Sequence, residues 1–247
     1  MEAGETRRGG LGAELDRIEA AVDAGDTGLA RLGFWRIVGL VKRDDELIQR
    51  HAEQVGRIDA KAFRKVVPVR LPVWLGNLLL ALGLAVGLFA LSVAVWKGTP
   101  NLAFEYAPTL AGIGLVVAAG AWMVAFHSPT HWLVGRLVGI RFTDYFLKSP
   151  LAPPGLKTDY ASYLRVSPTA RAWMHASGAL ATKVAPFLVL VLASAYDVDA
   201  PGWAIVILWV LAIGQIVTDV VFSTKRSDWK KVRRELAVAR ARAGAAS

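Results

Sequence analysis

The sequence has no cysteine, only four histidines among 247 residues, and no secretory signal of the usual design. The absence of cysteine excludes disulfide bonds and thiolate metal ligands, so a bound metal would need histidine and carboxylate ligands. The first 70 residues are polar, and we therefore expect the first membrane span itself to direct insertion. Because histidine is so rare, the neighbouring pair His127 and His131 stands out.

Apolar residues make up 54% of the chain and gather in long runs, which is too apolar for an ordinary soluble domain. A helix of about 20 apolar residues is long enough to cross the hydrocarbon core of a bilayer. We therefore expect an all-α integral membrane protein with four transmembrane helices in contact with the lipid bilayer. The expected spans are residues 71–96, 107–126, 172–196 and 203–222.

The polar region before the first span has apolar residues at helical spacing, beginning with Leu11, Leu15, Ile18 and Val22. A further helix is predicted to start near Asp44 and to continue toward the first span. These patterns indicate a cytoplasmic or interfacial helical region. The expected domains are a disordered tail over 1–10, this helical region over 11–70, a four-helix transmembrane domain over 71–224 and a basic C-terminal helix over 225–247.

Positive charge is unevenly placed around the expected spans. The connections over 97–106 and 197–202 have almost no Lys or Arg, whereas the long internal loop over 141–171 and the tail from Lys225 are basic. Since cytoplasmic loops are enriched in Lys and Arg, we expect both termini to face the cytoplasm at an inner or plasma membrane. Ser227 as N-cap, followed by Asp228, is a candidate start signal for the tail helix. We expect this helix to contact anionic lipids. The basic residues flank spans instead of forming a folded basic face, so nucleic-acid binding is not expected.

Ionisable side chains at membrane depth are costly to bury and are functional candidates for that reason. His127 and His131 are four residues apart, the spacing at which two imidazoles share one face of a continuous helix. Three different expected spans contribute to the candidate site, so its members could converge. The candidates are His127, His131, His175, Lys183 and Asp219.

The segment HSPTHWLVGRLVGIRFTDYF is similar in layout to the first signature of site-2-protease-like intramembrane metalloproteases. A second segment, ASGALAT, resembles the small-residue stretch of the same family, and the likeness extends over residues 107–222. The resemblance implies a site-2-protease-like core that holds Zn²⁺ through His127, His131 and Asp219. It also places Ser128 where the family has the glutamate that takes a proton from metal-bound water.

Pro129 leaves two interpretations of the histidine pair open. Proline removes a backbone donor and clashes with the preceding helical turn, so the second span could end near His127. Ser128 would then cap a new helix with Pro129 at its first position, and both histidines would be structural. A helix that continues through Pro129 would instead bring the two imidazoles together.

The other candidates also have two interpretations each. His175 is either an interfacial histidine or a partner of a metal ligand. Lys183 either extends toward the cytoplasmic headgroups or forms an ion pair with Asp219 inside the bundle. A carboxylate fully paired with Lys183 is a poorer metal ligand, so these interpretations compete for Asp219.

Three functions remain open at this point. The first is a membrane protein of site-2-protease-like architecture with a His/His/Asp metal site and degraded or altered hydrolase chemistry. The second is a non-enzymatic membrane scaffold or adaptor, which would act through a membrane-protein partner or a homo-oligomer. The third is a small transporter or channel subunit that uses Lys183 and Asp219.

Overall fold

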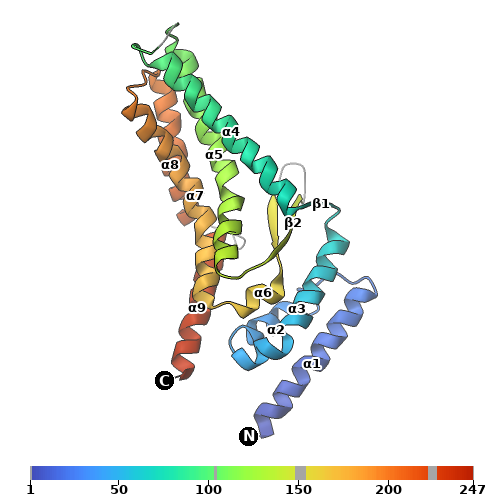
Figure 1. Cartoon of the computed structure of the whole chain (residues 1–247). Helices are drawn as coiled ribbons and strands as arrows, with labels where there is room; N and C mark the ends of the chain where they lie inside the picture. Colours follow the sequence, from blue (N-terminus) through green and yellow to red (C-terminus); the bar gives the residue numbers. More distant parts are fainter. Residues whose placement is uncertain (1, 103–104, 148–153, 222–226, 247) are drawn as a thin grey trace. The chain divides into compact units, whose positions relative to one another are not determined.

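The structure, a computed structural model, describes residues 2–102, 105–147, 154–221 and 227–246, and for 2–9, 219–221 and 245–246 it describes the backbone alone. The chain is mostly helical, as predicted, and it also has a small sheet that the sequence analysis did not predict (Figure 1). Its elements are α1 (Glu2–Asp23), α2 (Phe34–Val41), α3 (Asp45–Val66), β1 (Val69–Pro72), α4 (Val73–Gly98), α5 (Pro108–Leu137), β2 (Phe142–Leu147), β3 (Gly155–Thr158), α6 (Tyr160–Arg165), α7 (Pro168–Ala195), α8 (Gly202–Val221) and α9 (Asp228–Ala246).

The chain divides into two compact units, each built from separate stretches of sequence. The first unit combines Met1–Val73 with Gly135–Ala172 and Arg234–Ser247, and the second combines Trp74–Val134 with Trp173–Arg233. The expected domains were contiguous, so the structure differs from them in assigning the long loop and most of the tail helix to the same unit as the N-terminal region.

The first unit has a helical core in which α1, α2 and α3 bury their apolar faces, together with Leu164 of α6. Leu15, Ile18 and Val22 of α1 are completely buried, as their helical spacing predicted. Helix α1 begins at Glu2, within the stretch expected to be a disordered tail. Helix α3 begins where expected, because the Asp44 carboxylate caps it by accepting hydrogen bonds from two backbone N–H groups.

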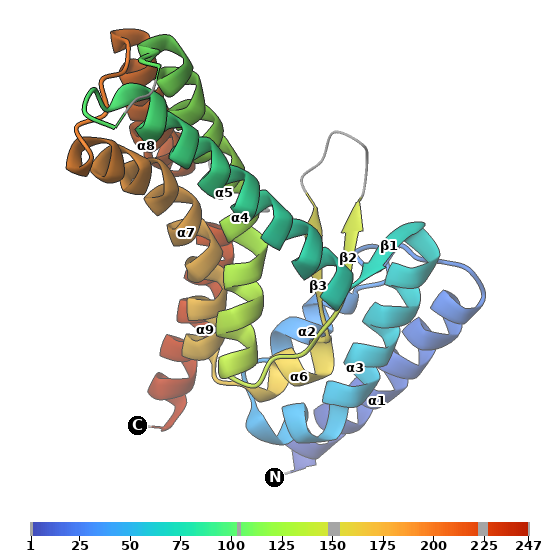
Figure 2. The ribbon, with the colours of Figure 1, turned by 45° about the horizontal axis from the view of Figure 1, so that its top comes forward.

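The sheet of the first unit is antiparallel, with strand order β1-β2-β3. Strands β2 and β3 lie within the segment that was expected to be a long loop. Figure 2 shows the three strands side by side with α3 near them. The sheet packs on α3 through an edge-to-face contact between Phe146 and Phe63 and a buried ion pair between Lys157 and Asp59.

The second unit contains three helices that are long and apolar enough to cross a membrane: α4, α5 and α7. These helices indicate a membrane protein. Within α8, the stretch Gly202–Thr218 forms a shorter apolar helix. Many large apolar side chains of this unit are exposed, among them Leu82, Phe89 and Val210, as expected for residues that face lipid hydrocarbon.

Small residues allow the helices of the second unit to approach closely, and α5 is rich in Gly and Ala. Ala94 and Ala118 are buried in the core of this unit. A Cβ atom added to Gly114 of α5 would lie 2.7 Å from the backbone carbonyl oxygen of Ala90 in α4. Backbone-to-backbone contact of this kind is typical of membrane helices, which are held together mainly by packing.

Candidate metal centre

Helix α5 runs without a break from Pro108 to Leu137, with Pro129 inside it. The interpretation in which the span ends near His127 is therefore wrong, and the continuous-helix interpretation holds. The next residue, Thr130, donates a hydrogen bond from its hydroxyl to the Phe126 carbonyl, one turn earlier in the helix, at 2.6 Å. The two imidazole rings of His127 and His131 consequently lie on one helix face, with centroids 4.7 Å apart.

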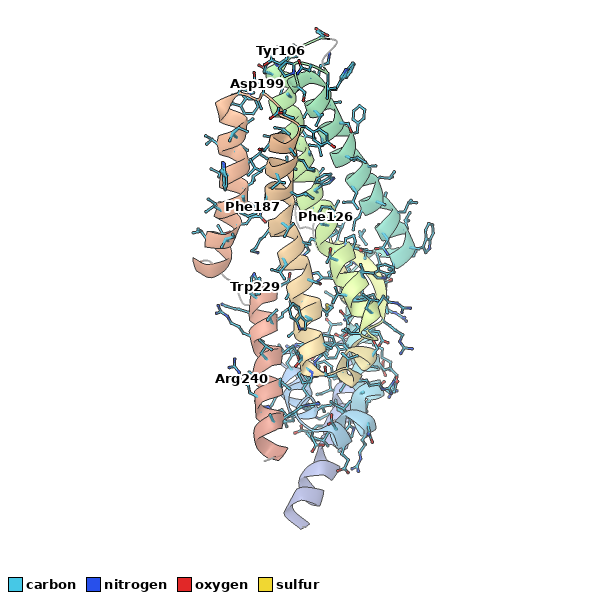
Figure 3. The ribbon with its side chains drawn as sticks, turned by 60° about the vertical axis from the view of Figure 1, so that its left-hand side comes forward. Tyr106, Phe126, Phe187, Asp199, Trp229 and Arg240 are labelled. Carbon is cyan, nitrogen blue, oxygen red and sulfur yellow. The ribbon has the colours of Figure 1, made fainter. Side chains whose placement is uncertain are left out.

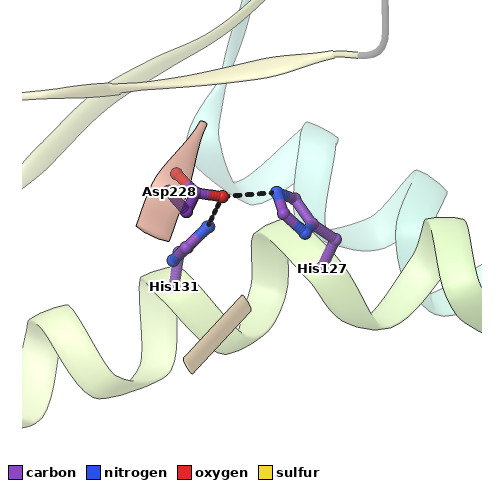
Figure 4. Close-up of side chains that lie close together, drawn as sticks. All are labelled: His127, His131 and Asp228. Atoms are coloured by element: carbon purple, nitrogen blue, oxygen red, sulfur yellow. Dashed lines mark hydrogen bonds and ion pairs between the residues drawn. The ribbon is translucent and has the colours of Figure 1, made fainter. Parts of the chain in front are cut away.

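A carboxylate from α9 meets these two rings (Figure 4). Oδ2 of Asp228 lies 3.4 Å from Nε2 of His127 and 3.3 Å from Nε2 of His131. The three ligand atoms all lie within 4.8 Å of one another. With metal–ligand bonds of about 2.0 Å, two ligands of a tetrahedral zinc site are separated by about 3.3 Å, so two of the three separations already match that geometry.

The backbone fixes which nitrogen of His131 can face the carboxylate. Nδ1 of His131 lies 2.6 Å from the carbonyl oxygen of Met174 in α7. A carbonyl oxygen only accepts hydrogen bonds, so Nδ1 must donate. The neutral ring therefore presents the lone pair of Nε2 to Asp228, which is the tautomer that binds metals.

The hydroxyl group of Thr182 selects the tautomer of the neutral His127 ring in the same way. Nδ1 of His127 lies 2.9 Å from Oγ1 of Thr182, and that hydroxyl lies 3.0 Å from the carbonyl oxygen of Gly178, one turn earlier in α7. The hydroxyl has one proton, which it donates to this carbonyl, so it accepts from Nδ1 of His127. Nε2 of His127 is again left as an acceptor that faces Asp228.

When both rings are neutral, three acceptors thus converge on one point, and a cation between them would satisfy all three, whereas a proton on one ring would satisfy Asp228 and that ring alone. Protonation of both rings would place two imidazolium groups beside each other and near the ammonium of Lys231, with Asp228 as their counter-ion. Like charges at this separation disfavour such a state. A single divalent cation satisfies all three acceptors while both rings stay neutral.

Asp228 is oriented from its other side by the helix that carries it. Nζ of Lys231 lies 2.8 Å from Oδ1, which leaves Oδ2 directed at the histidines. Burial raises the pKa of the Asp228 carboxyl, but the charge of Lys231 and, when the ring is protonated, a hydrogen bond from His131 outweigh this effect and hold the pKa well below its usual range. Asp228 is therefore ionised and available as a ligand.

The centre is largely enclosed. The side chains of His131 and Asp228 are 11% and 14% exposed, whereas that of His127 is 37% exposed. Gly178 of α7 makes room for the His131 ring, because a Cβ atom at this position would lie 2.3 Å from Nε2. The exposed edge of His127 gives the site its access from outside.

The structure brings together two of the three predicted ligands and adds one that the sequence analysis did not select. The backbone of Asp219 lies in α8, but its side chain is outside the described residues, so its role as a ligand stays a prediction. Asp228 had been considered only as part of the start of the tail helix. That start is confirmed, since the Ser227 hydroxyl accepts a hydrogen bond from the Lys230 N–H.

The remaining candidates lie around this centre. The ring of His175 has its centroid 6.4 Å from that of His131. Lys183 donates to the Ala179 carbonyl at 3.2 Å, and its ammonium lies 5.6 Å from the ring centroid of Trp229. The proposed ion pair between Lys183 and Asp219 stays a prediction, because the Asp219 carboxylate is not among the described side chains.

Ser128, at the position where the resemblance places a glutamate, is buried. Comparison of the chain with protein-family models, with curated proteins and with solved structures found no match. The resemblance to site-2-protease-like enzymes accordingly stays a prediction.

Proposed function

We propose that this chain is a membrane protein that binds one divalent metal ion through His127, His131 and Asp228. The observation that carries the proposal is the convergence of two imidazole nitrogens and one carboxylate oxygen, with Thr182 and the Met174 carbonyl selecting the neutral tautomers that direct Nε2 toward Asp228. Such an arrangement is stable when a cation lies between the acceptors. Two neutral imidazoles whose Nδ1 protons are donated elsewhere have no proton left for the carboxylate. Hydrogen bonds among these three groups therefore cannot satisfy all three acceptors.

The donor set favours Zn²⁺ over the other common divalent ions. Two imidazole nitrogens and one carboxylate oxygen form a ligand set that is common in zinc sites, whereas Mg²⁺ and Ca²⁺ prefer oxygen ligands throughout. Three protein ligands leave a fourth position, in which a zinc ion would hold water and lower its pKa. The enclosed imidazoles of α5 and the carboxylate of α9 would hold and orient this ion.

We further propose that the protein is a site-2-protease-like relative without peptidase activity. A serine hydroxyl does not act as a base at neutral pH unaided, and Ser128 stands where the resemblance calls for a glutamate. Among the described residues, the carboxylate at the His pair is that of Asp228, which serves as a ligand. The metal would then stabilise the arrangement of α5, α7 and α9 and would not activate water for peptide hydrolysis.

Elemental analysis of the detergent-purified full chain tests the metal site directly. We expect about one zinc per chain in the wild type, and loss of the metal in His131→Ala and Asp228→Asn. His175→Ala is the matched control, because this ring is not part of the group of potential ligands among the described residues. A folded wild-type protein that binds no metal after equilibration with Zn²⁺ would contradict the proposal.

For the topology, we propose four spans, with α8 as the fourth, and cytoplasmic termini. The support is the low Lys and Arg content of the connections over 97–106 and 197–202 and the basic character of 141–171 and the tail. The absence of cysteine makes the test simple, since any introduced cysteine is unique. With a membrane-impermeant maleimide, Asn101→Cys should react from outside intact cells and Ala241→Cys only after lysis.

Contact of the basic tail with anionic lipids is part of the same proposal, as is a membrane-protein partner or a second copy of the chain. The support for lipid contact is the excess of basic residues from Lys225 onward, where eight Lys and Arg accompany two acidic residues. Both acidic residues are engaged with other groups, Asp228 at the histidines and Glu235 in a buried ion pair.

A further inference from the structure

Helix α9 has three charged residues at intervals of seven: Asp228, Glu235 and Arg242. Residues i and i+7 lie on the same face of an α-helix. The first of them meets the histidine pair. Glu235 and Arg242 make contacts within the first compact unit. These contacts hold α9 at positions that follow Asp228 in the helix.

Glu235 of α9 is a buried carboxylate that accepts hydrogen bonds from three side chains. Its side chain is 4% exposed and accepts hydrogen bonds from Nζ of Lys42 at 2.5 Å and from Nε of Arg171 at 2.6 Å. The hydroxyl of Tyr163 donates a third, at 2.8 Å. Arg171 is completely buried, so its charge depends on Glu235 for compensation.

Arg242, seven residues after Glu235, also contacts Lys42. Its Nε and Nη2 donate to the carbonyl oxygen of Lys42 at 3.0 and 2.8 Å, and its Nη1 lies 2.8 Å from Oδ1 of Asp45. The Lys42 carbonyl is at the C-terminal end of α2, where helix carbonyls lack partners within the helix. Lys42 is thus held through its side chain by Glu235 and through its backbone by Arg242.

We propose that Glu235 and Arg242 are positioning residues of the metal centre, because they fix the helix that presents Asp228 to His127 and His131. Metal binding and the attachment of α9 at Lys42 are then thermodynamically coupled. The coupling is reciprocal: attachment raises the affinity for the metal, and bound metal strengthens the attachment by the same factor. The inference rests on the proposed metal site.

The first test measures the Zn²⁺ affinity of the full chain in detergent by competition with a chelator. Arg242→Gln and Glu235→Gln should each lower the affinity about tenfold or more, within the range typical of coupled sites, although neither residue touches the metal ligands. Arg240→Gln is the matched control: it removes the same charge from an exposed position on the same helix (Figure 3). It should leave the affinity unchanged.

The second test measures the reverse effect by limited trypsin digestion within α9, which has exposed basic residues such as Arg233 and Arg234. Zn²⁺ should protect α9 in the wild type and in Arg240→Gln, and the protection should be much smaller in Arg242→Gln. Arg242 is only partly buried, so this variant remains informative even where Glu235→Gln fails to fold.

The two proposals fail in different ways. A folded wild type that binds no Zn²⁺ overturns the metal site and the coupling with it. A wild type that binds Zn²⁺, together with unchanged affinity and unchanged protection in Arg242→Gln, overturns the coupling alone. An equal loss of affinity in Arg240→Gln would assign the effect to the net charge of the tail and would also contradict the coupling.

Discussion

Nε2 of His131 lies 3.3 Å from Oδ2 of Asp228, while Nδ1 of the same ring is committed to the Met174 carbonyl. The relationship joins residues separated by 97 positions in the sequence. It also sets the protonation state of the ring, because a carbonyl cannot donate. The neutral imidazole faces Asp228 with its lone pair, and together with Nε2 of His127 the three atoms form a group that could hold a cation.

The geometry of the site assigns Asp228 as the third metal ligand, whereas the family resemblance implied Asp219. Substitution of each residue distinguishes the two assignments. We expect Asp228→Asn to lower the Zn²⁺ affinity at least about tenfold, because the amide has no charge, whereas Asp219→Asn should have little effect. Isothermal titration or chelator competition on the full chain measures both. The reverse order of effects would show that Asp219 is the ligand and that Asp228 lies near the histidines without binding the metal.

Gly178 offers a test that leaves every ligand in place. A Cβ atom at this position would lie 2.3 Å from Nε2 of His131, so Gly178→Ala should displace the ring and weaken metal binding about tenfold or more. Gly120→Ala is the control, since an added Cβ there meets no neighbouring atom within 4 Å. Equal metal affinities in the two variants would contradict the role of Gly178 in seating the ring.

Close packing of α4 against α5 gives a prediction about stability. At Gly114 an added Cβ would meet the Ala90 carbonyl oxygen at 2.7 Å, and a backbone atom cannot move aside as a flexible side chain can. Gly114→Ala should therefore destabilise the protein by about 1–3 kcal/mol, the usual range for overpacking. Thermal unfolding in detergent measures the effect, with Gly120→Ala again as control. A Gly114→Ala protein as stable as the wild type would show that the two helices can separate without cost.

The sequence predicted those features that depend on local patterns. Long apolar runs indicated the membrane helices, helical spacing indicated the buried face of α1, and the interval between His127 and His131 indicated a shared helix face. Each of these features depends on residues within a few turns of one another. The periodicity of the sequence therefore contains the necessary information.

The features that were missed depend on contacts between distant segments. Strand β1 pairs with β2 more than 70 positions later, for example Val69 with Leu147, and β2 lies in a segment that was expected to be a loop. Asp228 lies outside the apolar runs, so a search for ionisable residues within spans did not consider it. A signal was nevertheless present: Asp228, Glu235 and Arg242 repeat at intervals of seven in a tail that is otherwise strongly basic.

His51 of α3 provides a prediction about pH. It is 6% exposed, and its Nε2 has no hydrogen-bond partner among the described residues. Burial, and then the charge of Arg50, lowers the pKa of His51, while Asp16 acts in the opposite direction. The neutral ring is thus the form that the folded protein prefers, and it lies against Gly12 of α1, where an added Cβ would be 3.7 Å from Cε1.

The sign of the effect follows from the two pKa values. The unfolded chain has a histidine pKa of about 6.5, and the folded value is lower. The stabilising contribution of the neutral ring is therefore fully present above about pH 6.5 and is lost as the pH falls through the folded pKa. Acidification from pH 7.5 to 5 should increase hydrogen exchange in α1 and α3 of the full chain. His51→Leu should remove most of this dependence, and an unchanged dependence in that variant would assign the effect to other groups.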